Sequence, residues 1–402
     1  MNNKSFLAAL LLLVFASCSK EVDSNGNNAP QTDVERLIGE FYKSVTPMSK
    51  GEINEPEIKS ISRQTFQIID GKPIEALGRA ATDNSNTFDL ETVEFALNGK
   101  MGYAVLSDDP RIDRVFYFTE NGSVQDTAYI EPLKELIDTI PYIAAQGIID
   151  PESIIVTKPN KIFGPVVKTQ WGQGYPYNMY ATACDCSECS SVYYRGHNPI
   201  GCVTTATAQV MAKLRKFPHT FYGTKMLDFK NLPQNLLMTN EQAQAIGHFF
   251  HEIALCCQIK FNCGGSSGTV KAVYQYLKDL GYKCEYVEDG VDLGKLESEI
   301  INDCPHLIGG HSSKSGHMWI IDGVRIIDGV YGYHCNWGWD GRSDGWTDGN
   351  PYTPKGATEG YTKNICNIYI DNYEKIIAGE IDGPGVMDTT GLPGIGGGII
   401  NL

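Results

Sequence analysis

After about residue 32, the apolar residues first have the spacing of a helix, then that of strands, and then that of a helix again. From Val34 to Val45 apolar residues recur every three or four positions, which predicts a helix. Runs of β-branched and aromatic residues predict strands at 65–69, 93–97, 102–106 and 114–118, and a closing helix is expected at 131–140. This order predicts a small α+β domain over residues 32–150.

A second set of elements begins near residue 200. Apolar residues at 206, 210, 211 and 214 have helical spacing, whereas Pro199 and Gly201 cannot extend that helix backwards. Further helices are predicted at 241–259, 270–280 and 293–301, and short strands follow His317 and precede Asn336. We therefore expect a second α+β domain over residues 166–375.

Cys202 is predicted to be the first residue of the helix that follows Gly201. A helix N-terminus carries partial positive charge and unpaired backbone N–H groups, which favour a thiolate and bind a developing oxyanion. Cys202 is therefore a candidate nucleophile. The alternative is that Cys202 is a half-cystine or a buried packing residue.

Two later residues provide the groups that a thiol nucleophile needs. His317 lies before a short apolar run ended by Asp-Gly, and Asn336 ends a second run of aromatic residues. A nucleophilic thiol needs a base, and the base needs a partner that fixes its ring, so we expect Asn336 to hydrogen-bond the imidazole. His311 is the main rival base, with His197 also close to the motifs, and a structural core role is the alternative for Asn336.

Several segments resemble the streptopain family of bacterial papain-like cysteine proteases. The catalytic segments of that family are similar to GCVTTATAQVMAKL, SGHMWIIDG and CNWGWDG, and the start of its mature enzyme is similar to TQWGQGYPYN. The resemblance runs from about Gly164 to about Ile370. It implies a papain-like domain with a helical half and an antiparallel β half. It also implies endopeptidase activity on extended polypeptides with an apolar residue one position before the scissile residue.

Three aromatic or amide side chains are candidates for the substrate cleft. In papain-like enzymes a glutamine upstream of the nucleophile donates to the oxyanion hole, and Gln173 is the candidate here, together with the Cys202 backbone N–H. Trp337 and Trp339 are expected to line the cleft. Packing or turn roles are the alternatives for all three side chains.

The N-terminal domain also resembles part of a streptopain-type protein. The segment YAVLSDDPR, from Tyr103 to Arg111, is similar to a strand and turn of prodomains that keep such enzymes latent. We expect residues 32–150 to be an inhibitory prodomain that binds in cis, with a folding or export aid as the alternative. Residues 151–165 contain proline, glycine and lysine and are predicted to be the activation linker, cut between 158 and 165.

The first residues predict export. Lys4 precedes an apolar run of ten residues, Phe6–Phe15, which is too short to span a bilayer, so residues 1–17 are predicted to be a signal peptide. Small residues before Cys18 resemble a bacterial lipoprotein signal, which implies lipidation of Cys18 and anchoring at the cell envelope or surface. Residues 18–31 are then a polar tether, and the glycine-rich residues 376–402 are expected to be a tail.

Charge and cysteine content limit the partners. The net charge of -15, without clustered lysine or arginine, argues against nucleic acid and against electrostatic membrane binding. Cys184, Cys186 and Cys189 have a C-x-C-x-x-C spacing that could bind zinc, but only one such group exists in the sequence. In an exported chain we expect such cysteines to form disulfides, and we expect no metal and no organic cofactor.

Together these observations predict an exported cysteine endopeptidase made as a latent zymogen. Cys202 is the predicted nucleophile, His317 the general base and Asn336 the residue that orients it. An amidase or transpeptidase on the same fold is one alternative. The other is a catalytically inactive binding or inhibitor protein.

Overall fold

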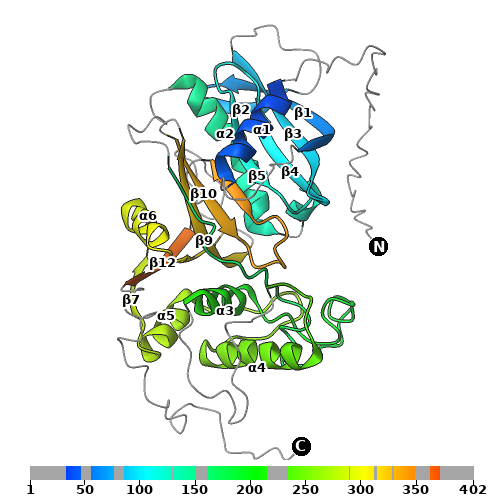
Figure 1. Cartoon of the computed structure of the whole chain (residues 1–402), viewed down its shortest axis with the longest axis vertical. Helices are drawn as coiled ribbons and strands as arrows, with labels where there is room; N and C mark the ends of the chain where they lie inside the picture. The colour runs from blue at the N-terminus through cyan, green and yellow to red at the C-terminus, as the bar shows by residue number, and fades with distance from the viewer. Residues whose placement is uncertain are drawn as a thin grey trace, which may run out of the picture.

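The computed structural model describes ten stretches of the chain, shown coloured in Figure 1. They are residues 33–46, 56–76, 86–128, 130–150, 161–214, 234–288, 290–311, 315–327, 330–348 and 363–371. The predicted signal peptide, Cys18, the tether, the glycine-rich tail and residues 151–160 of the predicted linker lie outside these stretches.

The N-terminal domain has the helices and strands that the apolar pattern predicts, with longer bounds. Helix α1 spans Asp33–Val45 and α2 spans Glu131–Ile149, so α2 continues past Pro141, where the prediction ended it. The strands are β1 (Glu57–Ile69), β2 (Lys72–Glu75), β3 (Thr87–Leu97), β4 (Lys100–Ser107) and β5 (Arg114–Thr119), followed by the 3-10 helix η2 (Val124–Ala128). The apolar stripe of α1 packs on the strands, which buries Val34, Ile38 and Phe41.

The second domain divides into a helical part and a sheet. The helices are α3 (Cys202–Leu214), α4 (Asn240–Cys256), α5 (Val270–Asp279) and α6 (Leu293–Ile301). The strands are β6 (Lys161–Phe163), β7 (Lys283–Glu288), β8 (His306–His311), β9 (Gly316–Ile327), β10 (Val330–Asn336), β11 (Gly345–Asp348) and β12 (Lys363–Asp371). Helices α4, α5 and α6 begin at Thr239, Thr269 and Asp292, whose side chains accept backbone N–H groups, as N-caps do.

The two domains share one antiparallel sheet among the described residues. Its strand order is β2-β1-β3-β4-β5-β11-β10-β9-β8-β12-β7, and β6 pairs with β9 outside this order. The domains meet where β5 pairs with β11, with Trp346 opposite Phe118 and Thr347 opposite Tyr117. Figure 1 shows the N-terminal strands at the top, the orange strands in the middle and the helices α3, α4 and α5 below.

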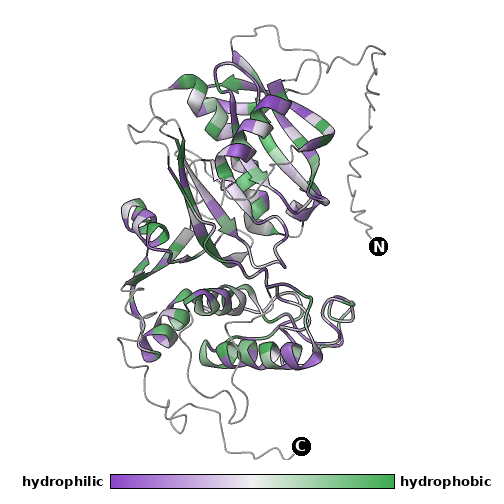
Figure 2. Cartoon of the chain, viewed as in Figure 1, coloured by the Kyte–Doolittle hydropathy of each residue, from purple (hydrophilic) through white to green (hydrophobic). Residues whose placement is uncertain are grey.

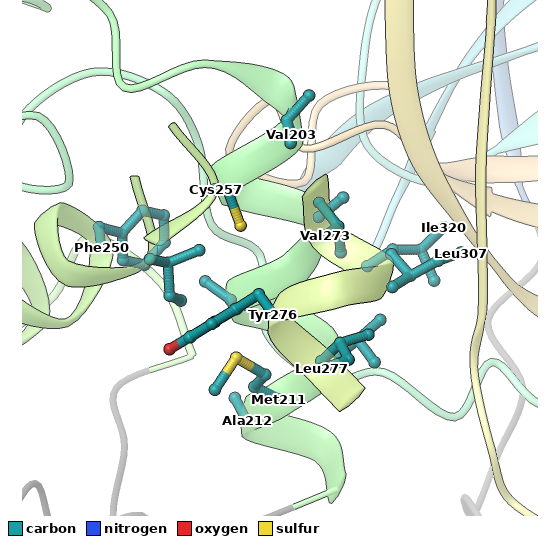
Figure 3. Packing of buried hydrophobic residues seen from close by; sticks show 14 of the residues in the cluster. Val203, Met211, Ala212, Phe250, Cys257, Val273, Tyr276, Leu277, Leu307 and Ile320 are labelled. Carbon is teal, nitrogen blue, oxygen red and sulfur yellow. The ribbon is translucent and has the colours of Figure 1, made fainter. Parts of the chain in front are cut away.

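The core of the helical part lies between α3, α4, α5 and the sheet. Figure 3 shows Val273 and Leu277 of α5 beside Met211 of α3, with Leu307 and Ile320 of the sheet on the other side. All five side chains are at most 1% exposed. Figure 2 shows that α4 carries both apolar and polar residues, and its buried face includes Ile246, Phe249, Phe250 and Ile253. This packing fixes α3, and with it Cys202, against the sheet.

None of the helices in the described part of the chain has both the length and the apolar character that a bilayer crossing requires.

Candidate active site

Cys202 is the first residue of α3, as the apolar spacing predicts. Gly201 before it has φ of 93°, a left-handed conformation that favours glycine, and Ser266 lies against it: a Cβ on Gly201 would meet the Ser266 carbonyl oxygen at 3.2 Å. The thiol of Cys202 is half-buried and lies close to the backbone N–H of Met318 on β9. The start of α3 and the residue after His317 are therefore neighbours in space.

His317 lies near the start of β9, opposite Gly310 of β8. Its Nε2 nitrogen is 3.1 Å from the backbone carbonyl oxygen of Trp337. A carbonyl only accepts hydrogen bonds, so Nε2 carries the ring proton in the neutral state, and Nδ1 is left as the basic nitrogen. The rival base, His311, is exposed at the end of β8, and His197 contacts the Ala181 carbonyl oxygen through Nδ1 at 2.8 Å.

The protonation states differ from the sequence prediction. Burial raises the pKa of the Cys202 thiol, although the nearby backbone N–H groups of Met318 and Val203 act in the opposite direction. Burial also lowers the pKa of His317 to about 4, against the smaller raising effect of the Trp337 carbonyl. In the unprocessed chain Cys202 and His317 are therefore a neutral pair near pH 7. Desolvation therefore opposes the thiolate that the helix N-terminus and the backbone N–H groups favour.

Asn336 ends β10 as predicted, but the hydrogen bond predicted between it and the imidazole is wrong. Its Oδ1 accepts from Gln209 Nε2 at 2.9 Å and from the Gly338 N–H at 3.1 Å, and its Nδ2 donates to the Thr169 carbonyl oxygen at 3.2 Å. The carbonyl of Trp337, the next residue, contacts the His317 ring instead. Asn336 thus fixes the backbone that holds the imidazole.

Gln209 is a residue that sequence reasoning missed. It lies on α3 two turns after Cys202 and is fully buried. Its Oε1 accepts the N–H of Trp171 and the hydroxyl of Thr169, both at 3.1 Å, while its Nε2 donates to Asn336. A glutamine among the apolar residues of a helix was the available signal, because a buried amide needs partners. Gln209 joins three segments of the site.

Backbone hydrogen bonds of Gln173 hold it close to the segment that leads into Cys202. Its carbonyl oxygen accepts the N–H of Ile200 at 3.0 Å, two residues before Cys202, and its own N–H donates to the Tyr193 hydroxyl at 3.2 Å. Gln173 is 7% exposed. Its position fits a donor to the oxyanion hole, and its role remains the prediction made from the resemblance.

Trp337 and Trp339 differ in their surroundings. Trp337 is 1% exposed, its ring lies 5.9 Å from that of Trp319, and its backbone N–H donates to Asp344 Oδ1 at 2.8 Å. The Trp319 ring in turn stacks on the His317 ring at 6.1 Å. Trp337 is thus part of the core beneath the imidazole in the full chain, whereas Trp339 is only partly buried against that core.

The loop after Trp339 is held by the N-terminal domain. Thr119 donates to the Asp344 carbonyl oxygen at 2.6 Å, and Asn121 donates through Nδ2 to the Gly341 carbonyl oxygen at 3.0 Å. Ser343 donates its N–H to the Asn121 carbonyl oxygen at 2.7 Å, and further hydrogen bonds join Ser343 to Tyr117 and Asp126. We call residues 341–345 the clamped loop.

The clamped loop begins beside the segment that carries Gln173. The Asp340 N–H donates to the Trp171 carbonyl oxygen at 3.3 Å. The Asp340 carboxylate lies so close to Gly172 that a Cβ there would meet its Oδ1 at 2.2 Å. Contacts therefore run from the N-terminal domain through the clamped loop to the residues next to Gln173.

The predicted linker is partly structured. Lys161–Phe163 forms β6, which pairs with Val324 to Ile326 of β9. Val166 and Val167 then donate their N–H groups to the carbonyl and carboxylate oxygens of Asp322. A cut within β6 would require this strand to detach from β9 first.

One disulfide is present among the described cysteines, between Cys186 and Cys263. The other nine described cysteines, including Cys184 and Cys189, are thiols, so of the three cysteines expected to form disulfides only Cys186 is bonded. The adjacent Cys256 and Cys257 are both thiols and are not joined to each other, since neighbouring cysteines can pair only with strain.

Comparisons with known proteins agree with this geometry. Residues 171–347 match the sequence profile of the Peptidase C10 family. Streptopain of Streptococcus pyogenes is 24% identical over 298 residues, which cover 61% of this chain and 70% of streptopain. The thiol protease/hemagglutinin PrtT of Porphyromonas gingivalis is 25% identical over 205 residues, covering 44% of this chain and 22% of PrtT.

A solved structure shares the fold. A fragment of prointerpain A from Prevotella intermedia superposes with a TM-score of 0.52 at 20% identity, covering 76% of this chain and 98% of the fragment. The predicted α+β papain-like fold, preceded by a small α+β domain, is thereby confirmed.

Proposed function

We propose that this cysteine endopeptidase, whose residues 171–347 match the Peptidase C10 family, is made as a zymogen with Cys202 as its nucleophile. The main support for this proposal is the contact between the start of α3 and the start of β9. The Cys202 thiol lies by the Met318 N–H, and the adjacent His317 ring is held by the Trp337 carbonyl.

In the proposed mechanism, Nδ1 of His317 takes the thiol proton of Cys202, and the sulfur attacks the carbonyl carbon of a peptide bond. The carbonyl oxygen becomes an oxyanion, which the Cys202 backbone N–H and the Gln173 side chain stabilise. The imidazolium returns the proton to the leaving amine as the C–N bond breaks, which leaves a thioester. Water, deprotonated by His317, then attacks the thioester and releases the acid and the thiol. No step needs a metal or an organic cofactor.

Latency follows from how the N-terminal domain holds the site. It joins the catalytic sheet through β5 and β11 and bonds the clamped loop, and contacts continue from that loop to Gly172 beside Gln173. In this bound form His317 and Cys202 are both neutral. We propose that a cut before Lys161 frees the N-terminal domain and lets the cleft, including Trp337 and Trp339, accept a polypeptide.

The location of the enzyme is proposed from the first residues alone. Residues 1–17 are assigned as an export signal and Cys18 as the lipidated residue, with residues 18–31 as the tether to the envelope. Globomycin treatment or Cys18→Ala should change the mass and membrane association of the chain. A cytoplasmic wild-type protein without lipid would contradict this assignment.

The zymogen proposal is tested by expressing residues 19–402 as wild type and as Cys202→Ala and following intact mass with time. We expect the wild type to convert by a cut between residues 150 and 161, and Cys202→Ala to stay whole. If a separate protease is needed, the linker is cut with an added protease, and a thiol-directed epoxide should then label Cys202. A cut wild-type chain that neither binds the epoxide nor hydrolyses an unfolded protein contradicts the proposal and favours an inactive binding protein.

A further inference from the structure

Four cysteine side chains converge beside the active site without a role in the proposed mechanism. Cys184, Cys186 and Cys189 come from the loop before α3, and Cys263 comes from the turn between α4 and α5. Their four Sγ atoms all lie within 4.8 Å of one another. Cys263 is 74 positions from the nearest of the other three cysteines. The spacing in the sequence therefore indicated only three candidate ligands, whereas the fold adds Cys263 as a fourth.

The sulfur positions are close to those of a tetrahedral metal site. A zinc ion bound by four thiolates at about 2.3 Å sets its sulfurs about 3.8 Å apart. Cys184 Sγ and Cys186 Sγ are already 3.4 Å apart. The bonded pair, Cys186 and Cys263, must separate for all four sulfurs to surround one ion, while every other sulfur pair is already within 4.8 Å.

The loop is built to hold these sulfurs in place. The Cys189 N–H lies 3.5 Å from Cys186 Sγ, and N–H groups directed at sulfur stabilise metal-bound thiolates. Backbone hydrogen bonds close the turns on either side: Cys184 N–H donates to the Gly196 carbonyl oxygen at 2.8 Å, and the Gly196 N–H donates to the Cys189 carbonyl oxygen at 2.7 Å. Cys189 is fully buried and the other three cysteines are half-buried.

We propose that Cys184, Cys186, Cys189 and Cys263 bind one Zn²⁺ ion in the reduced chain. A disulfide uses two of the four sulfurs and leaves two thiols in contact with it, where they can exchange with the bonded pair. A single divalent ion uses all four sulfurs in one arrangement, and four thiolates in a tetrahedron select zinc or iron. Zinc has no redox chemistry of its own, which suits a site that only joins two loops.

The binding step starts from four thiols, which lose their protons as the four Zn–S bonds form. The Cys186–Cys263 disulfide is the oxidised alternative. It enters the zinc form only after a phosphine or thiol reductant supplies two electrons and breaks the S–S bond. The proposal therefore revises the expectation that this group of cysteines only forms disulfides.

The site would tie together two loops that flank the nucleophile. The turn that carries Cys263 continues to Ser266, whose hydroxyl donates to the Pro199 carbonyl oxygen at 2.6 Å and whose own carbonyl lies against Gly201. An ion at the four sulfurs would hold this turn against the residues directly before Cys202. The proposal does not depend on catalysis, because metal binding is measured on a chain without the catalytic thiol.

The test uses the full chain from residue 19 with Cys202→Ala, reduced with a phosphine, stripped with a chelator and titrated with Co²⁺ in the absence of oxygen. Tetrahedral thiolate ligation gives an intense near-ultraviolet charge-transfer band and strong d–d bands in the red. We expect both to saturate at one equivalent of Co²⁺ and to disappear when one equivalent of Zn²⁺ is added. Replacing Cys184, Cys189 or Cys263 by serine should abolish the d–d bands, whereas Cys366→Ser, a control thiol on β12, should keep them.

A second measurement covers the case in which a serine variant fails to fold. Zinc-loaded chain is treated with an alkylating reagent before and after addition of a chelator, and the modified cysteines are identified by peptide mass spectrometry. We expect all four cysteines to be protected by zinc and exposed by the chelator, with Cys366 unaffected. The proposal is overturned if the reduced wild-type chain binds no stoichiometric Co²⁺, or if the four cysteines react equally with and without zinc.

Discussion

The hydrogen bond between Asp126 of the N-terminal domain and Ser343 of the clamped loop offers a measure of how tightly the N-terminal domain is held. Ser343 Oγ donates to Asp126 Oδ2 at 2.9 Å, Ser343 is fully buried and Asp126 is 9% exposed. Asp126→Ala removes the acceptor of the buried Ser343 hydroxyl and, within the N-terminal domain, of the Ser123 N–H.

The size of the effect follows from the burial and the charge of this pair. A hydrogen bond to a charged group contributes about 1.5–3 kcal/mol. Since about 1.4 kcal/mol is a factor of ten, the affinity of the N-terminal domain for the rest of the chain should fall about 10- to 150-fold. Ser343→Ala should cause a similar loss, and the double variant should lose little more than either single variant, because both remove the same bond.

The assay uses the Cys202→Ala chain cut between residues 150 and 161, so that the two parts are held only by non-covalent contacts. Their dissociation constant is measured by binding of one part to the immobilised other part. Asp138→Ala is the matched control: it removes a carboxylate of the same domain that is ion-paired with Lys134 on the exposed side of α2. If the dissociation constant of Asp126→Ala is no larger than that of Asp138→Ala, the clamped loop does not hold the domains together.

Two further predictions concern the site itself. Burial raises the pKa of Cys202 and lowers that of His317 to about 4, so alkylation of Cys202 in the unprocessed chain should rise as the pH is raised through the alkaline range. A plateau that begins at mildly acidic pH would instead show a thiolate–imidazolium pair. Gln209→Ala removes the hydrogen bonds to the buried Trp171 N–H, the buried Asn336 and the half-buried Thr169, and should lower the free energy of unfolding by about 2–4 kcal/mol in chemical denaturation. Lys213→Ala removes a partly exposed ion pair of the same helix and should cost less than about 1 kcal/mol; equal losses would contradict the role given to Gln209.

The sequence could predict where Cys202 and His317 lie because each depends on local structure. A glycine turn before a helical repeat places Cys202, and an apolar run that follows a glycine places His317. The contact of Asn336 could not be predicted in the same way. It depends on Gln209, which is 127 positions away and turns the amide of Asn336 away from the imidazole.

Long-range pairing explains the other differences. The sequence divides the chain into two domains, whereas the fold joins them through β5 and β11, because a strand edge pairs with any suitable strand regardless of sequence distance. The same reason makes residues 161–163 a strand on β9 although their composition indicated a linker. Cys263 joins the other three cysteines through the turn after α4, which no local spacing reveals.

The central claim is that His317 activates Cys202. It is tested most directly by measuring how fast a slowly turned-over ester substrate acylates Cys202 in the processed enzyme, with mass spectrometry to locate the thioester. The account predicts that His311→Ala acylates at the wild-type rate and that His317→Ala is slower by about 10²- to 10⁴-fold, the contribution of a general base. Acylation of His317→Ala at the wild-type rate would contradict it.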